Sequence, residues 1–174
     1  PTDVAFAPDS ETIIASVGNG ATILKYSLAR LFAGHAGGAA GVAFTPDGKQ
    51  LAAARQRTDH EAEIELWSVA EGRIVRRFTG HRELVNALAF SPDGNRVAFF
   101  GRREGGRALI LANVLKGKIE TAIDMDVEQQ LSPAWSPAGD KIAFSGHRRG
   151  RFDIYELDMA TQEVRQITND DVFD

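Results

Sequence analysis

Basic side chains recur at three corresponding places in the sequence, each between two apolar segments. A guanidinium group presents a planar fork of N–H donors that matches a carboxylate or a phosphate, so clustered arginines attract anionic partners. If each pair of apolar segments forms two neighbouring strands, these residues occupy the loops that connect them. The candidate partner-binding residues are Arg55, Arg57, Arg102, Arg103, Arg107, His147, Arg148, Arg149 and Arg151.

Residues for catalysis or metal binding do not form a recognised constellation. The sequence lacks a G-x-S-x-G nucleophile elbow, an H-E-x-x-H zinc motif and a phosphate-binding P-loop. Its four histidines have no metal-ligand spacing: His35, His60, His81 and His147. The acids Asp124, Asp126 and Glu128 suit a hard cation, but such a run is more often a solvated turn. We therefore predict no catalytic residue, no cofactor and no metal site.

The composition is that of a soluble globular domain, with 43% hydrophobic and 25% charged residues. A formal net charge of −4 over 174 residues argues against a general nucleic-acid binder. The absence of cysteine excludes disulfides and thiolate zinc sites. No apolar run approaches the roughly 18–20 residues that a membrane span needs. We therefore expect neither a nucleic-acid partner nor a membrane span.

A turn motif recurs four times and organises the chain. In Leu88–Gly101, LAFSPDGNRVAFFG, two apolar runs flank the turn Ser91–Asn95. Proline fixes one backbone angle, aspartate bonds its own backbone and glycine accepts a positive φ, so this segment predicts a β-hairpin. The corresponding prolines are separated by 38, 46 and 45 residues: Pro8, Pro46, Pro92 and Pro137.

These repeats predict an all-β chain built of β-propeller blades. A period of about 40–45 residues with four strands is typical of a blade, and no segment has the apolar periodicity of a helix. We expect one domain over residues 1–174, with four-stranded antiparallel blades at 4–41, 42–87, 88–132 and 133–174.

In the first blade the third strand is expected to run through Leu28. The segment Arg30–Ala33 then follows so closely that a fourth strand is hard to place.

An aromatic residue stands two positions before each turn proline. Because both faces of a blade pack against neighbouring blades, we expect these residues in the core between blades rather than stacked on a ligand. They are Phe6, Phe44, Phe90 and Trp135.

The predicted fold separates the charges into two ends. Loops between the second and third strands of every blade emerge at one end of a propeller, and these are the basic loops. The proline turns at the opposite end carry acids, diluted by Lys49: Asp9, Glu11, Asp47, Asp93 and Asp140. Aligned loop charges of this kind would attract an acidic protein segment, a carboxylate or a phosphate. The plainer interpretation stays open, since turn chemistry selects aspartate and exposed arginines keep loops soluble.

Two families resemble these repeats. The pairs Gly34-His35 and Gly80-His81 precede inner strands, and Leu66-Trp67-Ser68 is similar to the terminal dipeptide of a WD-repeat blade, with Ser in place of Asp. The fourth repeat, SPAGDKIAFSGHRRGRFDIYELDMATQEVRQIT, resembles the TolB-type propeller repeat still more closely. The resemblance covers almost the whole chain.

The WD-repeat resemblance implies structural rather than catalytic roles for His35, Trp67 and His81. In that family the histidine joins a hydrogen-bonded network with a loop Asp, a strand hydroxyl and the Trp. The network is partial here, because Ala54 stands where the hydroxyl belongs and Ala112 stands where the next blade would have its Trp.

The TolB-like resemblance implies a non-enzymatic scaffold that binds a protein or a peptide. It implies work in bacterial assemblies, with the periplasm favoured over the cytoplasm. The alternative is the gating propeller of a larger prolyl oligopeptidase-like serine hydrolase, whose catalytic domain would lie outside this sequence. A third hypothesis, a propeller lyase or hydrolase with a central metal, finds no support in the histidine spacing.

Four blades leave three arrangements open: a small closed ring, half of an eight-bladed dimer, or an arc of a larger ring. The chain starts at an inner strand and ends in a segment similar to the approach to a further blade. We therefore favour part or half of a larger propeller. Its open blade edges would then support a homodimer.

Overall fold

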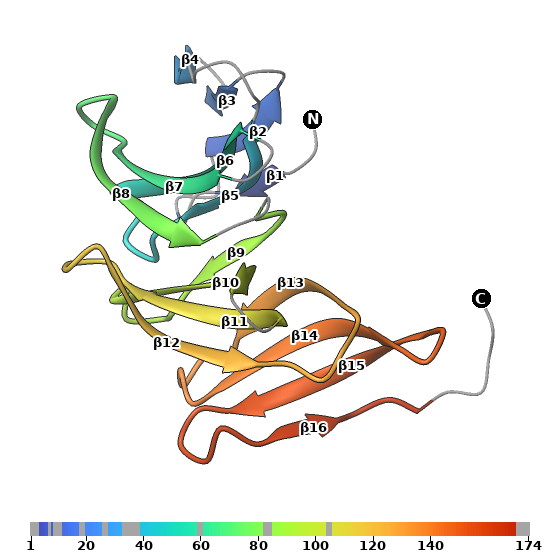
Figure 1. The fold of residues 1–174 in the computed structure, drawn as a ribbon. Coiled ribbons are helices and arrows are strands. Elements are labelled where there is room, and N and C mark those ends of the chain that lie inside the picture. The colour runs from blue at the N-terminus through green and yellow to red at the C-terminus, as the bar shows by residue number, and fades with distance from the viewer. Residues whose placement is uncertain are drawn as a thin grey trace.

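The computed structural model describes residues 4–6, 8, 12–17, 20–25, 28–32, 39–58, 61–81, 85–103 and 106–169. Within these ranges the chain forms four sheets, each of four antiparallel strands in chain order, and no helix (Figure 1). Sheet 1 contains β1 (Val4–Phe6), β2 (Thr12–Val17), β3 (Gly20–Lys25) and β4 (Leu28–Phe32). Sheet 2 contains β5 (Ala39–Phe44), β6 (Gln50–Thr58), β7 (Glu61–Ser68) and β8 (Arg73–His81). Sheet 3 contains β9 (Leu88–Phe90), β10 (Arg96–Arg103), β11 (Gly106–Asn113) and β12 (Lys118–Asp124). Sheet 4 contains β13 (Gln129–Trp135), β14 (Lys141–Arg148), β15 (Arg151–Asp158) and β16 (Val164–Gln166).

The prediction of an all-β chain of four-stranded antiparallel sheets is confirmed. The expectation for the outer edge of the first blade is wrong. The strand predicted to continue through Leu28 is two strands, because Lys25 of β3 pairs with Leu28 of β4 and the chain reverses between them. Sheet 1 therefore has its fourth strand.

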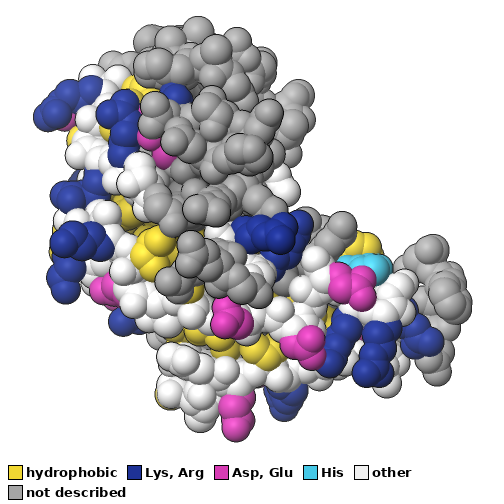
Figure 2. Space-filling view, in the orientation of Figure 1, with side chains coloured by type: hydrophobic (Ala, Val, Ile, Leu, Met, Phe, Trp, Pro, Cys, Tyr) yellow, Lys and Arg dark blue, Asp and Glu magenta, His cyan; other side chains and the backbone are white. Residues whose placement is uncertain are grey.

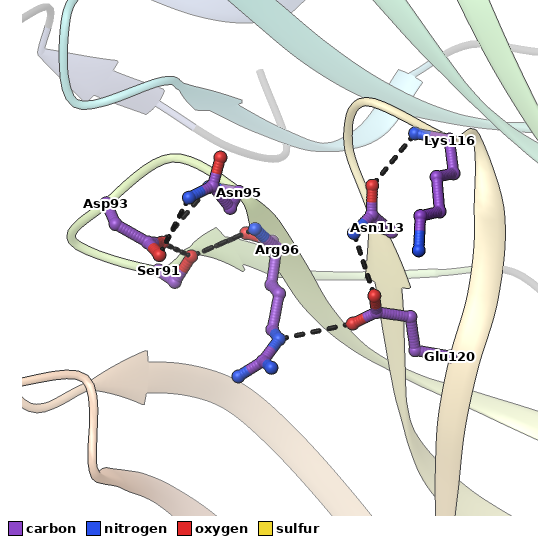
Figure 3. Close-up of polar contacts among 7 residues, drawn as sticks. All are labelled: Ser91, Asp93, Asn95, Arg96, Asn113, Lys116 and Glu120. Atoms are coloured by element: carbon purple, nitrogen blue, oxygen red, sulfur yellow. Dashed lines mark hydrogen bonds and ion pairs between the residues drawn. The ribbon is translucent and has the colours of Figure 1, made fainter.

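The proline turns of sheets 2, 3 and 4 are closed by hydrogen bonds between residues of the turn itself, which Figure 3 shows for the turn before β10. The Ser91 hydroxyl donates to Asp93 Oδ1 over 2.6 Å, and the backbone N–H of Asn95 donates to the same oxygen over 3.1 Å. Ser91 Oγ in turn accepts from the backbone N–H of Arg96. Gly94 has a φ of +71°, a conformation that a side chain would disfavour. These hydrogen bonds to the charged form hold the pKa of Asp93 below its usual value of 3.8, with the Ser91 hydroxyl as the largest cause.

The same turn chemistry recurs in sheets 2 and 4. The Thr45 hydroxyl donates to Asp47 Oδ1 over 2.7 Å. In sheet 4 the aspartate stands two positions later, because Ala138 occupies the usual position, and Ser136 Oγ donates to Asp140 Oδ1 over 2.6 Å. The hydrogen bond from the hydroxyl to an aspartate therefore forms in sheet 4 as well, although the aspartate stands two positions later in the turn.

A second network joins the turn before β10 to the outer strand of the same sheet (Figure 3). Arg96 Nε donates to Glu120 Oε2 over 3.1 Å, and Asn113 Nδ2 donates to Glu120 Oε1 over 2.7 Å. Asn113 Oδ1 also accepts from the backbone N–H of Lys116. The hydrogen bond from Asn113 is the main cause of the lowered pKa of Glu120.

Consecutive proline turns touch one another across the sheets. A Cβ built on Gly48 would lie 3.3 Å from Cδ of Pro8 in the preceding turn. A Cβ built on Gly94 would lie 3.5 Å from Cδ of Pro46, and one built on Gly139 would lie 3.5 Å from Cδ of Pro92. The glycines of the second, third and fourth turns therefore each pack against the proline of the turn before, and the four turns form one stack.

Sheet 3 buries both of its faces, because successive side chains of a strand point in opposite directions. Val97 and Phe99 of β10 face sheet 2, where they pack with Ile64, Leu66 and Phe78. On the other face, residues of sheets 3 and 4 form one cluster: Ala98, Leu109, Leu111, Ile123, Met125, Ile142, Phe144, Tyr155 and Leu157. A smaller cluster, Val42, Leu51, Ala53 and Trp67, lies on the face of sheet 2 that points away from sheet 3.

Three of the four predicted aromatic core residues lie where the sequence places them. Phe44, Phe90 and Trp135 are partly buried, and each packs against one of these clusters. Trp135 also donates from Nε1 to the backbone carbonyl of Ala89 in sheet 3 over 3.2 Å. The side chain of Phe6 lies outside the described residues.

Replacing Asp93 with Asn tests the turn network through pH. Because the folded-state pKa of Asp93 lies below its unfolded value, the carboxylate stabilises the fold above about pH 4 and loses this effect as the pH falls through the folded pKa. We expect D93N to lower the free energy of unfolding by about 1 kcal/mol at neutral pH. In urea titrations the gap between wild type and D93N should close towards pH 2. The control D124N neutralises another exposed carboxylate and should show little gap at either pH. An equal gap for D93N at both pH values would contradict the role given to the charge.

Candidate functional site

The β6–β7, β10–β11 and β14–β15 hairpins lie at one end of their sheets, opposite the stacked proline turns. This follows from the common strand order of the sheets and from the contacts between consecutive turns. The hairpins carry most of the basic residues singled out in the sequence. We call Arg102, Arg107, His147, Arg148, Arg149 and Arg151 the basic hairpin end.

Several of these arginines are exposed side by side. Arg102 and Arg107 pair across β10 and β11, and both are exposed. Arg149 and Arg151 are exposed at the tip of the β14–β15 hairpin. Figure 2 shows Lys and Arg side chains gathered next to acidic side chains and a histidine on this side of the molecule. The side chains of Arg57 and Arg103 lie outside the described residues.

Arg55 differs from the other predicted binding residues, because it lies inside strand β6 and points at buried acids. Its Nε lies 3.0 Å from Glu63 Oε1 and its Nη1 lies 3.6 Å from Glu65 Oε1. The N–H groups are not aimed at these oxygens, so the contacts are ion pairs without good hydrogen-bond geometry. With 15% of its side chain exposed, Arg55 serves the interior rather than the surface.

The acids that Arg55 contacts are unusually buried for carboxylates. Glu63 and Glu65 are 4% and 2% exposed, on the same face of β7 as Trp67. Arg77 of β8 is the second cation of the cluster, with its Nε 3.3 Å from Glu65 Oε1. The alternation in EIELWSV assigns these acids to one face, but it does not reveal that this face is covered. Buried carboxylates need such partners to remain charged.

Two of the three acids considered for a hard cation, Asp126 and Glu128, contact basic side chains instead. Arg148 Nη2 pairs with Asp126, and His147 Nδ1 lies 2.8 Å from Glu128 Oε2. The ring of His147 also lies against Phe152, with 4.8 Å between ring centroids. Among the described residues no group of three or more His, Asp or Glu side chains is arranged to hold a metal ion.

A polar pocket of about 280 Å³ opens beside the β14–β15 hairpin. Arginines dominate its lining, together with one acid, one phenol and two amides: Arg148, Arg149, Arg151, Asp153, Tyr155, Gln166 and Asn169. Both oxygens of Asp153 accept hydrogen bonds, from Gln166 Nε2 over 3.0 Å and from Thr168 Oγ1 over 3.1 Å. The pocket thus combines an excess of positive charge with groups that donate hydrogen bonds. It is suited to an anion.

The three residues expected to have structural roles have different outcomes. Trp67 is 8% exposed and belongs to the cluster on the face of sheet 2 that points away from sheet 3. His35 lies outside the described residues, and of His81 only the backbone, at the end of β8, is described. The hydrogen-bonded network of a WD-repeat blade therefore stays a prediction.

Comparison with known proteins identifies the repeat. The family model described as "TolB beta propeller domain" matches residues 5–172. The chain belongs to the TolB β-propeller family. The TolB-like resemblance stated from the fourth repeat is thereby confirmed, and with it the propeller fold. No curated protein matches the chain.

Solved structures show the same TolB-type fold at low sequence identity. A putative TolB from Agrobacterium tumefaciens is 21% identical with a TM-score of 0.78, over 95% of this chain and 64% of that one. TolB from Acinetobacter baumannii is 17% identical with a TM-score of 0.78, over 96% of this chain and 44% of that one. Hydrazine synthase of Kuenenia stuttgartiensis is 15% identical with the same TM-score, over 97% of this chain and 54% of that one. The chain therefore spans less than two thirds of the length of each.

The described part of this TolB propeller contains no helix long and apolar enough to cross a membrane.

Replacing Arg55 tests whether it serves the interior. The variant R55A leaves Glu63 and Glu65 buried with Arg77 as the remaining cation among the described residues, and we expect it to lower the free energy of unfolding by about 3 kcal/mol. The control R149A removes an exposed arginine at the hairpin tip and should change stability by less than about 0.5 kcal/mol. Urea unfolding monitored by tryptophan fluorescence measures both. A loss below about 1 kcal/mol for R55A would contradict the interior role.

Proposed function

We propose that this TolB propeller is a non-enzymatic scaffold that binds an acidic segment of a protein or peptide through its basic hairpin end. The observation that carries the proposal is the row of exposed arginines on neighbouring hairpins, Arg102 and Arg107 on sheet 3 and Arg149 and Arg151 on sheet 4. Several guanidinium groups held on one rigid surface attract an acidic chain and set its orientation. The described strands hold these groups at one end of two packed sheets.

The TolB resemblance supports a bacterial protein and, within the cell, the periplasm over the cytoplasm. The alternative, a gating domain of a larger serine hydrolase, depends on sequence beyond these 174 residues. No described residue favours it.

Charge reversal on the two ends of the sheets tests the proposal. The double variant R102E/R107E reverses the charge of the hairpin end of sheet 3. The matched control K49E/K118E makes the same change in net charge at the end of the proline turns. We expect the first to weaken binding of a fluorescent deca-glutamate peptide about tenfold and the second to change it little, with binding by the wild type falling as salt rises. Fluorescence anisotropy titrations measure both. Equal losses in the two variants, or no binding by the wild type, would refute the proposal.

We also propose that the outer face of sheet 4 associates with a second copy of the chain. Phe152, Ile154 and Ile167 are 56%, 42% and 48% exposed there, whereas corresponding apolar faces of sheets 2 and 3 are covered by neighbouring sheets. An apolar sheet face of this kind favours association.

Light scattering over a range of concentrations tests this association. We expect a dimer, with twice the 18.9 kDa mass of one chain, and a shift to monomer in the variant I154K, which places a charge in the contact. The control T161K places the same charge in the exposed β15–β16 turn and should remain dimeric. A wild type that is monomeric at all concentrations would refute the homodimer.

A further inference from the structure

Tyr155 is one of the residues that line the arginine-rich pocket. Tyr155 is 3% exposed, and its Oη makes no hydrogen bond within the protein. Buried hydroxyls nearly always have a partner, so an exception calls for an explanation. A bound ligand that accepts a hydrogen bond would supply it.

The ring of Tyr155 is fixed, so the hydroxyl is held in one place. One face of the ring stacks on Phe144, with centroids 5.5 Å apart and an angle of 15° between the planes. Gly146 of the neighbouring strand makes room for the ring, because a Cβ there would lie 2.9 Å from the Tyr155 ring carbons Cδ2 and Cε2. Tyr155 therefore belongs both to the core between sheets 3 and 4 and to the lining of the pocket. A fixed donor of this kind orients a ligand at low entropic cost.

The charges around the hydroxyl suit a ligand with a single negative charge. Arg149 and Arg151 lie at the hairpin tip, and Arg148 is anchored by Asp126. Asp153 is the one acid in the lining, and its oxygens accept hydrogen bonds from Gln166 and Thr168. The carboxylate of Asp153 would repel a dianionic phosphate more strongly than a carboxylate. The amides of Gln166 and Asn169 match the polar groups of a peptide backbone.

Building on the proposed function, we propose that this pocket binds one carboxylate group of the acidic peptide. The Tyr155 hydroxyl donates a hydrogen bond to the carboxylate, and the guanidinium groups of Arg149 and Arg151 neutralise its charge. Burial, as the largest cause, raises the pKa of Tyr155 above 10, so its hydroxyl keeps the proton that it donates at neutral pH.

Removing the Tyr155 hydroxyl alone provides the test. The variant Y155F keeps the ring and its packing, and R149A removes one guanidinium group. The control S145A removes a hydroxyl from the opposite face of sheet 4. The probes are deca-glutamate with an amidated C-terminus and deca-glutamine with a free C-terminus, which distinguish a side-chain carboxylate from a terminal one. Fluorescence anisotropy measures affinity, and thermal unfolding measures stability.

We expect Y155F and R149A each to weaken binding of a carboxylate-bearing peptide about tenfold, and S145A to leave it unchanged. Y155F should unfold at the same temperature as the wild type or at a higher one, since it removes an unpaired buried hydroxyl. If Y155F binds as the wild type does while R102E/R107E binds weakly, the pocket inference fails and the proposed function stands. If neither variant weakens binding, both fail. Displacement of the peptide by inorganic phosphate at concentrations where acetate has no effect would also overturn the inference.

Discussion

The constraint on which this structure depends is that a sheet in the middle of the array must bury two apolar faces. Sheet 3 meets it with strands whose alternate residues pack in opposite directions, Val97 and Phe99 against sheet 2 and Ala98 against sheet 4. A shift of one residue in the pairing of β10 would exchange these faces, so packing fixes the register. The remaining features of the fold follow from this register. The proline turns meet at one end, and the hairpins are presented together at the other.

A single residue can belong both to the apolar core and to a polar site at the surface. Tyr155 belongs to the cluster between sheets 3 and 4 and also lines the pocket beside the β14–β15 hairpin. The position of the donor is therefore set by the packing of Phe144 and by the absence of a side chain at Gly146. Arg55 shows the opposite case, since a guanidinium group that the sequence suggests for the surface is used inside to compensate Glu63 and Glu65.

The sequence predicts the fold well because the fold is encoded locally and four times over. The turn residues around Pro92 and the alternation in EIELWSV are enough to place strands and faces. The sequence predicts the site less well, because the site depends on contacts between distant residues. Nothing local indicates that Arg148 pairs with Asp126 or that His147 lies beside Glu128, 22 and 19 positions away. The depth of Arg55 is also hidden, since it depends on how far β6 continues before the hairpin.

The stacked proline turns have a consequence for how such a chain can diverge. Spacings between the turn prolines differ, at 38, 46 and 45 residues, yet Gly48, Gly94 and Gly139 each meet the proline of the preceding turn in a similar contact. Differences in length are therefore accommodated elsewhere in the chain. The proline-turn end keeps the same contact from one sheet to the next, while the length of the chain between the turns varies. New specificities can then evolve, or be grafted in the laboratory, without a new solution to the folding problem.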